Sequence, residues 1–407
     1  MGLEAGFTRP DYTGHSIANI PAGIAALLGV PFAGLPPLAD ELWQPLGDVR
    51  RVVLLLVDAF GWNLFERLQA DLAWLTGRAM VRGQLTSIFP STTVAALSSV
   101  WSGLAPAGHG LVGLNLLFPQ FGTLGQMLKL SPLTVKQPDA LITAGLKPET
   151  FLAGRGMAEQ LAESGVPTFA FKGIDIVDSA LSRMHGRGVK QSVGVVTAAD
   201  MFVLMRDLLE KTAGQPLYIS AYWPAVDMLS HIHGWDHPTV AAEVRSLFHL
   251  LEQELWQPLS AAGRDKTALL VVADHGQTLT PVEKFIFLDD HPPLQDMLLL
   301  RPAGEPRAPY FYARPGRQAE IVAYVQHHLG YAAIPILSTE ALTAGLFGPP
   351  PFASDTPLRL GDILLLMRDG YTFFDPSERE KATQMKSRHG GLIPAEMRVP
   401  WLSFRLD

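Results

Sequence analysis

Cysteine is absent from the 407-residue sequence. Its absence excludes disulfide bonds, thiolate zinc ligands and a cysteine nucleophile. Any metal ion that the chain binds must therefore be held by histidine and carboxylate groups.

Long apolar runs and a positive charge balance are also absent. No stretch approaches the ~18 apolar residues of a membrane span, and residues 1–10 lack the basic and apolar regions of a signal peptide. The net charge of −7 gives no general attraction to nucleic acid backbones. The sequence therefore predicts a cytoplasmic protein that binds neither a membrane nor a nucleic acid. It leaves the oligomeric state open.

The amino-acid composition predicts a large folded core. Apolar residues make up 48% of the chain and charged residues 17%, which is a globular composition. Short Val- and Leu-rich segments alternate with helical patterns, and this alternation predicts an α/β fold with a doubly wound, mostly parallel sheet flanked by helices. We expect residues 1–50 to form an arm packed on the core. Residues 51–280 and 385–407 are expected to form that core, and 281–384 a small α+β cap insertion.

Acidic residues follow three of the predicted strands. Asp58 ends the strand at 51–57, Asp274-His275 ends the strand at 267–273, and Asp227 follows the strand at 216–222. One such Asp is ordinarily a helix cap. In a doubly wound sheet, however, ligands bind beyond the carboxyl ends of the strands, and a charged pair after a buried strand is costly unless something compensates it. A divalent cation is the natural compensation.

A run of hydroxyl residues precedes the helix predicted at 93–101. We expect Ser91 or Thr92 to cap this helix. The N–H of Thr93 is then one of the unpaired donors at the helix start, where a phosphoryl oxygen can bind. A hydroxyl at this position becomes a nucleophile when a base or a metal activates it.

Together these segments supply enough ligands for two metal ions. His231 lies four residues after Asp227, whereas His389 beside two glycines is weak evidence by itself. Zinc accepts such ligands, with manganese and magnesium as alternatives, and two ions ~3.5–4 Å apart can clamp an in-line displacement. The predicted ligands are Asp58, Thr93, Asp227, His231, Asp274, His275 and His389.

The order of these motifs resembles the alkaline phosphatase superfamily and, within it, the type I phosphodiesterase/nucleotide pyrophosphatase family. The resemblance covers residues 50–125, 215–280 and 385–405. It is carried by Asp58, the helix-start threonine, Asp227-x-x-x-His231, Asp274-His275-Gly276 and His389-Gly390.

The resemblance implies a role for each residue. Thr93 lies nine residues before Ser102-Gly103 and is the nucleophile by the spacing of the family. Thr92 is the alternative, because Phe89-Pro90 precedes the threonines here, whereas this pair follows the nucleophile in the family. Asn115 is the candidate phosphate contact, although its spacing differs from the family's by about one residue.

The resemblance also divides the ligands and implies an activity. Asp227, His231 and His389 would bind one ion. The other ion would be bound by Asp58, Asp274 and His275, together with Thr93. The implied reaction is metal-dependent hydrolysis of a phosphodiester or a nucleotide pyrophosphate bond, through a phospho-threonine intermediate. The implied partner is a small phosphate ester such as a nucleotide.

Other functions remain open from the sequence. A phosphomonoesterase, a phosphonate hydrolase and a metal-dependent phosphomutase of the same superfamily use similar ligands. A sulfatase is disfavoured, because it needs a Cys or Ser converted to formylglycine and the sequence has no cysteine and no Cys-x-Pro-x-Arg pattern. A catalytically inactive binding or signalling module is the alternative of another class.

Overall fold

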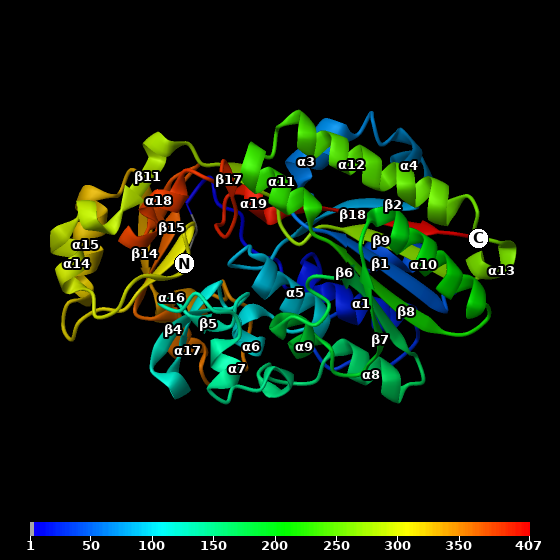
Figure 1. Cartoon of the computed structure of the whole chain (residues 1–407), viewed down its shortest axis with the longest axis horizontal. Coiled ribbons are helices and arrows are strands. Elements are labelled where there is room, and N and C mark those ends of the chain that lie inside the picture. The colour runs from blue at the N-terminus through cyan, green and yellow to red at the C-terminus, as the bar shows by residue number, and fades with distance from the viewer. Residues whose placement is uncertain (1–3) are drawn as a thin grey trace.

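A computed structural model describes residues 4–407, which form two lobes, each built around a seven-stranded sheet (Figure 1). The larger lobe contains a seven-stranded sheet of order β2-β18-β9-β1-β8-β6-β7. Its strands are β1 (Arg51–Val57), β2 (Val81–Thr86), β6 (Thr168–Gly173), β7 (Val189–Val195), β8 (Leu217–Trp223), β9 (Thr267–Val272) and β18 (Arg398–Arg405).

The centre of this sheet is parallel and one side of it is antiparallel. Strand β1 pairs in parallel with β8 and β9, and β6 pairs in parallel with β7 and β8. Strand β18 runs antiparallel to both β9 and β2. Every residue of β1 is buried, as expected for a Val- and Leu-rich strand covered on both faces. The predicted α/β class, with a mostly parallel sheet flanked by helices, is confirmed.

Helices cover both faces of the large sheet. In Figure 1, α3, α4 and α12 lie above it, and α1, α5 and α8 lie below it. Helix α1 belongs to the predicted N-terminal arm, and its Ile20 and Ile24 are buried in the main hydrophobic core. These helices are α1 (Ile20–Leu27), α3 (Trp62–Leu68), α4 (Ala73–Arg78), α5 (Thr93–Ser102), α8 (Met157–Glu163) and α12 (Pro238–Leu250). Among residues 4–407, no helix has both the length and the apolar character that crossing a bilayer requires.

The smaller lobe contains a second seven-stranded sheet, of order β14-β15-β13-β12-β3-β4-β5. Four strands come from the predicted insertion 281–384, and three come from residues 115–132, which the sequence analysis placed in the core. Gly304 of β12 pairs with Asn115 of β3 and joins the two parts. The strands are β3 (Asn115–Phe118), β4 (Thr123–Gln126), β5 (Ser131–Pro132), β12 (Ala303–Glu305), β13 (Ala308–Phe311), β14 (Ala333–Leu337) and β15 (Ile363–Met367).

A buried ion pair links the insertion to the large lobe. The guanidinium of Arg307 donates to both carboxylate oxygens of Glu396, at 3.0 and 2.8 Å, and both side chains are fully buried. Glu396 also accepts the N–H of Gly391 through its side chain and the N–H of Gly276 through its backbone carbonyl. Glu396 thereby holds the two loops that carry the predicted ligands His275 and His389. Arg307 in turn joins Glu396 to the insertion.

Replacing Arg307 with methionine is expected to lower the free energy of unfolding by about 3–5 kcal/mol, because it leaves the Glu396 carboxylate buried without a cation. Urea unfolding followed by circular dichroism measures the change. The control is Arg317→Met, which removes an exposed pair with Glu320 and should change stability little. If both variants lowered the free energy of unfolding equally, the buried ion pair would contribute no more to stability than the exposed one.

Candidate metal centre and nucleophile

The parallel pairing at the centre of the sheet places three acidic residues at one edge. Leu56 near the end of β1 lies beside Tyr222 of β8 and Val272 of β9. Asp58 directly follows β1, and Asp274 follows β9. Asp227 lies in the first turn of α11 (Ala225–His233), just after β8. The three acidic residues therefore lie at the same edge of the sheet, as their positions after the predicted strands indicated.

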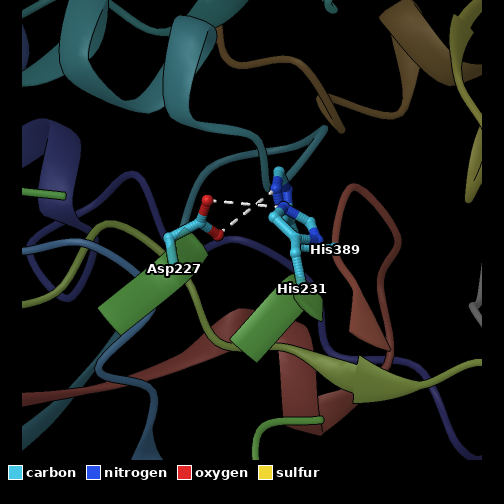
Figure 2. A group of neighbouring side chains, drawn as sticks. All are labelled: Asp227, His231 and His389. Atoms are coloured by element: carbon cyan, nitrogen blue, oxygen red, sulfur yellow. Dashed lines mark ion pairs between the residues drawn. The ribbon is translucent and has the colours of Figure 1, made fainter. Parts of the chain in front are cut away.

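The first ligand group consists of Asp227, His231 and His389, whose candidate ligand atoms all lie within 4.8 Å of one another. Nε2 of His231 is 3.3 Å from one carboxylate oxygen of Asp227, and Nε2 of His389 is 3.7 Å from the other. Figure 2 shows the carboxylate facing both imidazoles. Asp227 and His231 share one face of α11 because they are four residues apart.

Backbone carbonyls orient the two imidazoles of this group. Nδ1 of His231 lies 2.8 Å from the carbonyl oxygen of Ser387, and Nδ1 of His389 lies 3.0 Å from that of Ser91. A carbonyl can only accept a hydrogen bond, so each Nδ1 carries the proton when the ring is neutral. Each Nε2 then presents its lone pair towards Asp227, which is the usual arrangement of a metal-binding histidine.

The second group surrounds His275. Asp58, Asp227 and His275 offer ligand atoms within 4.8 Å of one another. Nε2 of His275 is 3.5 Å from Oδ1 of Asp58, 3.4 Å from Oδ2 of Asp274 and 3.1 Å from the hydroxyl of Thr93. Asp227 is thus a member of both groups, whereas the family resemblance assigned it to one ion.

The carboxylate oxygens that face His275 have no hydrogen-bond partner. Oδ1 of Asp58 and Oδ2 of Asp274 are both buried and unpaired. Their other oxygens are held, because Tyr222 donates to Oδ2 of Asp58 and the N–H groups of Ala59 and His275 donate to Oδ1 of Asp274. Unpaired buried carboxylate oxygens are costly, and a cation between them would satisfy both. The donor set, histidine nitrogen and carboxylate oxygen, fits zinc.

The electrostatics of the cluster also fit a cation. Burial raises the pKa of Asp58, and the nearby Asp274 carboxylate raises it further. Burial likewise raises the pKa of Asp274. Burial opposes the ionisation of Asp227 as well, but His231 and His389 outweigh it and hold the pKa of Asp227 below its ordinary value. A divalent ion supplies the positive charge that would let all three carboxylates ionise together.

Zinc is expected to raise the melting temperature more at neutral pH than at mildly acidic pH. The pKa values of Asp58 and Asp274 in the folded chain lie above their ordinary values. The protonated Asp58 and Asp274 therefore make their full contribution to the stability of the metal-free protein at low pH. This contribution is lost as the pH rises through their raised pKa values, because the two buried groups then have to ionise. Zinc binds the ionised carboxylates and removes this loss. Thermal unfolding with and without zinc measures the effect, and a zinc effect that is no larger at neutral pH would contradict it.

The structure separates the two candidate nucleophiles. Thr93 is the first residue of α5, is only partly buried, and has its hydroxyl 3.1 Å from Nε2 of His275. Thr92 precedes it in extended backbone, is 2% exposed, and hydrogen-bonds through its side chain to Glu305. Thr93 is the hydroxyl that lies among the predicted ligands.

The expectation that Ser91 or Thr92 caps helix α5 is wrong. Thr92 occupies the N-cap position but makes no side-chain cap hydrogen bond. The hydroxyl of Ser91 donates to the carbonyl of Gly391 and accepts the N–H of Gly390, and so holds the loop that carries His389. The first N–H groups of α5 are therefore not used by a side-chain cap. They remain suited to an anionic ligand.

Asn115, the predicted phosphate contact, is the first residue of β3. Its backbone pairs with Gly304 and Gln126. Its side-chain oxygen is buried and has no hydrogen-bond partner, so this amide has unmet hydrogen-bonding capacity. Its contact with a phosphate stays a prediction.

Three residues of the site were not predicted from the sequence. Tyr222 holds Asp58, and the pairing of β8 with β1 was the signal that would have found it. Gln277, two residues after His275, donates to the Asp227 carboxylate at 2.6 Å. Glu305 reaches Thr92 from the insertion, and no motif marks it.

Comparison with known proteins places the chain among hydrolases. The profile of the type I phosphodiesterase / nucleotide pyrophosphatase family matches residues 52–392. Murine ectonucleotide pyrophosphatase / phosphodiesterase 5 superposes with a TM-score of 0.63 at 15% identity, over 87% of each chain. Phosphonoacetate hydrolase from Sinorhizobium meliloti 1021, in complex with phosphonoacetate, gives a TM-score of 0.64 at 17% identity, over 87% of this chain and 90% of that chain. No curated protein sequence matches at a significant level.

A further solved structure is an inactive variant of the murine protein in complex with AMP, with a TM-score of 0.61 and 15% identity over 87% of this chain and 88% of that chain. Likeness at this identity confirms the predicted fold. The five ordered motifs predicted the same family that the profile finds, and that family is one of hydrolytic enzymes. The chain belongs to the type I phosphodiesterase / nucleotide pyrophosphatase family of hydrolytic enzymes.

Proposed function

We propose that the chain hydrolyses phosphodiester or nucleotide pyrophosphate bonds with the help of two bound divalent metal ions, through a covalent phospho-threonine at Thr93. The observation that carries the proposal is the position of the Thr93 hydroxyl, 3.1 Å from Nε2 of His275. The unpaired carboxylate oxygens of Asp58 and Asp274 face the same imidazole nitrogen. The proposed nucleophile, the candidate ligands and a helix start thus lie together.

The residues of the site would bind the two metal ions and the phosphoryl group as follows. Asp227, His231 and His389 would hold one ion, and Asp58, Asp274 and His275 the other, with Thr93 beside it. Bound zinc would supply Lewis acidity, which lowers the pKa of a hydroxyl and stabilises negative charge on phosphoryl and leaving oxygens. The first N–H groups of α5 and the Asn115 amide would bind the phosphoryl oxygens and orient the phosphorus towards Thr93.

The reaction would then take two displacements. The Thr93 oxygen loses its proton and bonds to phosphorus, while the bond from phosphorus to the leaving alcohol or phosphate breaks on the opposite side. Water next attacks the same phosphorus, which breaks the bond to Thr93, restores its hydroxyl and releases the phosphate product. Both displacements are of the in-line kind that a paired metal site favours.

A substrate panel tests the proposed function. The panel contains bis-p-nitrophenyl phosphate, p-nitrophenyl phosphate, ATP and phosphonoacetate, each assayed with zinc, manganese or magnesium. We expect hydrolysis of the diester or of the pyrophosphate bond to be fastest, and a chelator to abolish it until zinc is restored. Turnover that a chelator leaves unchanged would contradict the metal-dependent reaction.

Phosphonate hydrolysis is the second candidate, because one similar structure is a phosphonoacetate hydrolase with its ligand bound. Cleavage of phosphonoacetate without cleavage of either diester or pyrophosphate would favour it. A phosphomonoesterase would favour p-nitrophenyl phosphate, and a phosphomutase would transfer phosphate within a sugar phosphate without net release. We further propose zinc as the metal, a nucleotide or similar small phosphate ester as the substrate, and the cytoplasm as the location.

A further inference from the structure

Glu305 brings the insertion into contact with three segments of the site. It lies at the end of β12 and is 4% exposed. Its carboxylate accepts the N–H of Leu114 at 2.8 Å and hydrogen-bonds with the hydroxyl of Thr92. Its Cβ would lie only 2.8 Å from a Cβ added at Gly390, so the absence of a side chain at Gly390 allows the approach. Each contact is adjacent in the chain to a residue of the candidate site. Thr92 precedes Thr93, Leu114 precedes Asn115, and Gly390 follows His389.

The negative charge of Glu305 has no structural explanation in its contacts. Its two hydrogen bonds come from a backbone N–H and a hydroxyl. A neutral glutamine could make both, because its amide oxygen accepts the N–H and a hydroxyl can either donate to an amide oxygen or accept from an amide NH2. Among residues 4–407, no lysine or arginine forms an ion pair with it, whereas Arg307, two residues away, pairs with Glu396 instead. Burial raises the pKa of Glu305 to about 7, as expected for a buried acid without a basic partner.

We propose that Glu305 determines the charge of the substrate, so that a phosphodiester with one negative charge is accepted in preference to a phosphomonoester with two. This inference rests on the proposed function. The phosphoryl group would lie between the start of α5 and Asn115, and Glu305 contacts the chain on both sides of that position. Like charges repel strongly where water is excluded. The second charge of a monoester meets this carboxylate, whereas the esterified oxygen of a diester does not.

The variant Glu305→Gln tests the proposal, because it removes the charge and keeps hydrogen-bonding groups for Leu114 and Thr92. The substrates are methyl p-nitrophenyl phosphate, a diester monoanion, and p-nitrophenyl phosphate, a monoester dianion with the same leaving group. At mildly alkaline pH, where Glu305 is ionised, we expect the ratio of their kcat/KM values, diester over monoester, to fall about tenfold, equivalent to about 1.4 kcal/mol. The control is Glu340→Gln, an exposed glutamate of the insertion, which should leave the ratio unchanged. An unchanged ratio in Glu305→Gln would overturn the proposal.

A binding measurement separates this proposal from the proposed reaction. Isothermal titration of orthophosphate, a dianion at mildly alkaline pH, into the zinc-loaded protein should give an affinity about fivefold tighter for Glu305→Gln than for the unaltered chain. If the unaltered chain cleaves no ester at all, the proposed function fails, and orthophosphate affinity still decides the role of Glu305. An equal or weaker affinity in the variant overturns it. If Glu305→Gln does not fold, Glu305→Asp replaces it as the test variant. Because Glu305→Asp keeps the charge, its kcat/KM must remain higher for the diester than for the monoester.

Discussion

Thr93→Ala is expected to lower the turnover of bis-p-nitrophenyl phosphate by a factor on the order of 10⁴ or more and to leave the metal content unchanged. The variant removes the oxygen that forms the covalent bond to phosphorus. It leaves intact Asp58 and Asp274, whose unpaired oxygens face Nε2 of His275 beside it. Steady-state kinetics and elemental analysis of the same preparation measure both quantities.

The adjacent threonine provides the matched control. Thr92→Ala removes a hydroxyl that hydrogen-bonds to Glu305 and does not lie beside His275. We expect this variant to keep most of its turnover. If Thr93→Ala retained near-normal rates while Thr92→Ala lost them, the nucleophile would be Thr92, and the reaction would take place on the side of the insertion.

Loss of a metal ligand is expected to remove bound metal. Asp274→Asn should abolish binding of the ion beside His275, since the variant removes the charge of a fully buried carboxylate whose free oxygen faces that imidazole. His389→Gln should abolish binding of the ion beside Asp227, because Nε2 of His389 lies 3.7 Å from that carboxylate. Elemental analysis after dialysis against zinc should find one ion fewer in each variant.

His233→Gln is the control for the ligand variants. His233 lies on the same helix as His231, two residues further on, but it is exposed and belongs to neither ligand group. Its replacement should leave the zinc content as it was. Unchanged stoichiometry in Asp274→Asn and in His389→Gln would refute the proposed ligands, whatever the activity of the two variants.

The local chemistry of the strand ends was predictable from the sequence because it depends on short spacings. Asp58 and Asp274 follow buried strands that had to run in parallel, and this brings them to one edge. Asp227 and His231 are four residues apart, so either a strand end or a helical turn directs them to one point. His389, beside two glycines, was weak evidence by itself, and the family resemblance was needed to support it as a ligand.

Contacts between distant segments were not predictable in the same way. The second sheet forms because Gly304 pairs with Asn115 across a long separation in the chain, and no hydrophobic pattern indicates which strands will meet. Glu305 is part of the site for the same reason. The capping prediction failed because Ser91 makes its hydrogen bonds to Gly390 and Gly391, and these bonds exist only once the C-terminal loop has folded against α5.

Anomalous diffraction at the zinc and manganese absorption edges, on crystals grown with both ions, tests the two-metal centre most directly. We predict two anomalous peaks roughly 3.5–4 Å apart. One peak should be bounded by Asp227, His231 and His389. The other should be bounded by Asp58, Asp274 and His275, with the Thr93 hydroxyl beside it. A single peak, or peaks that these side chains do not contact, would contradict the proposed centre and the reaction built on it.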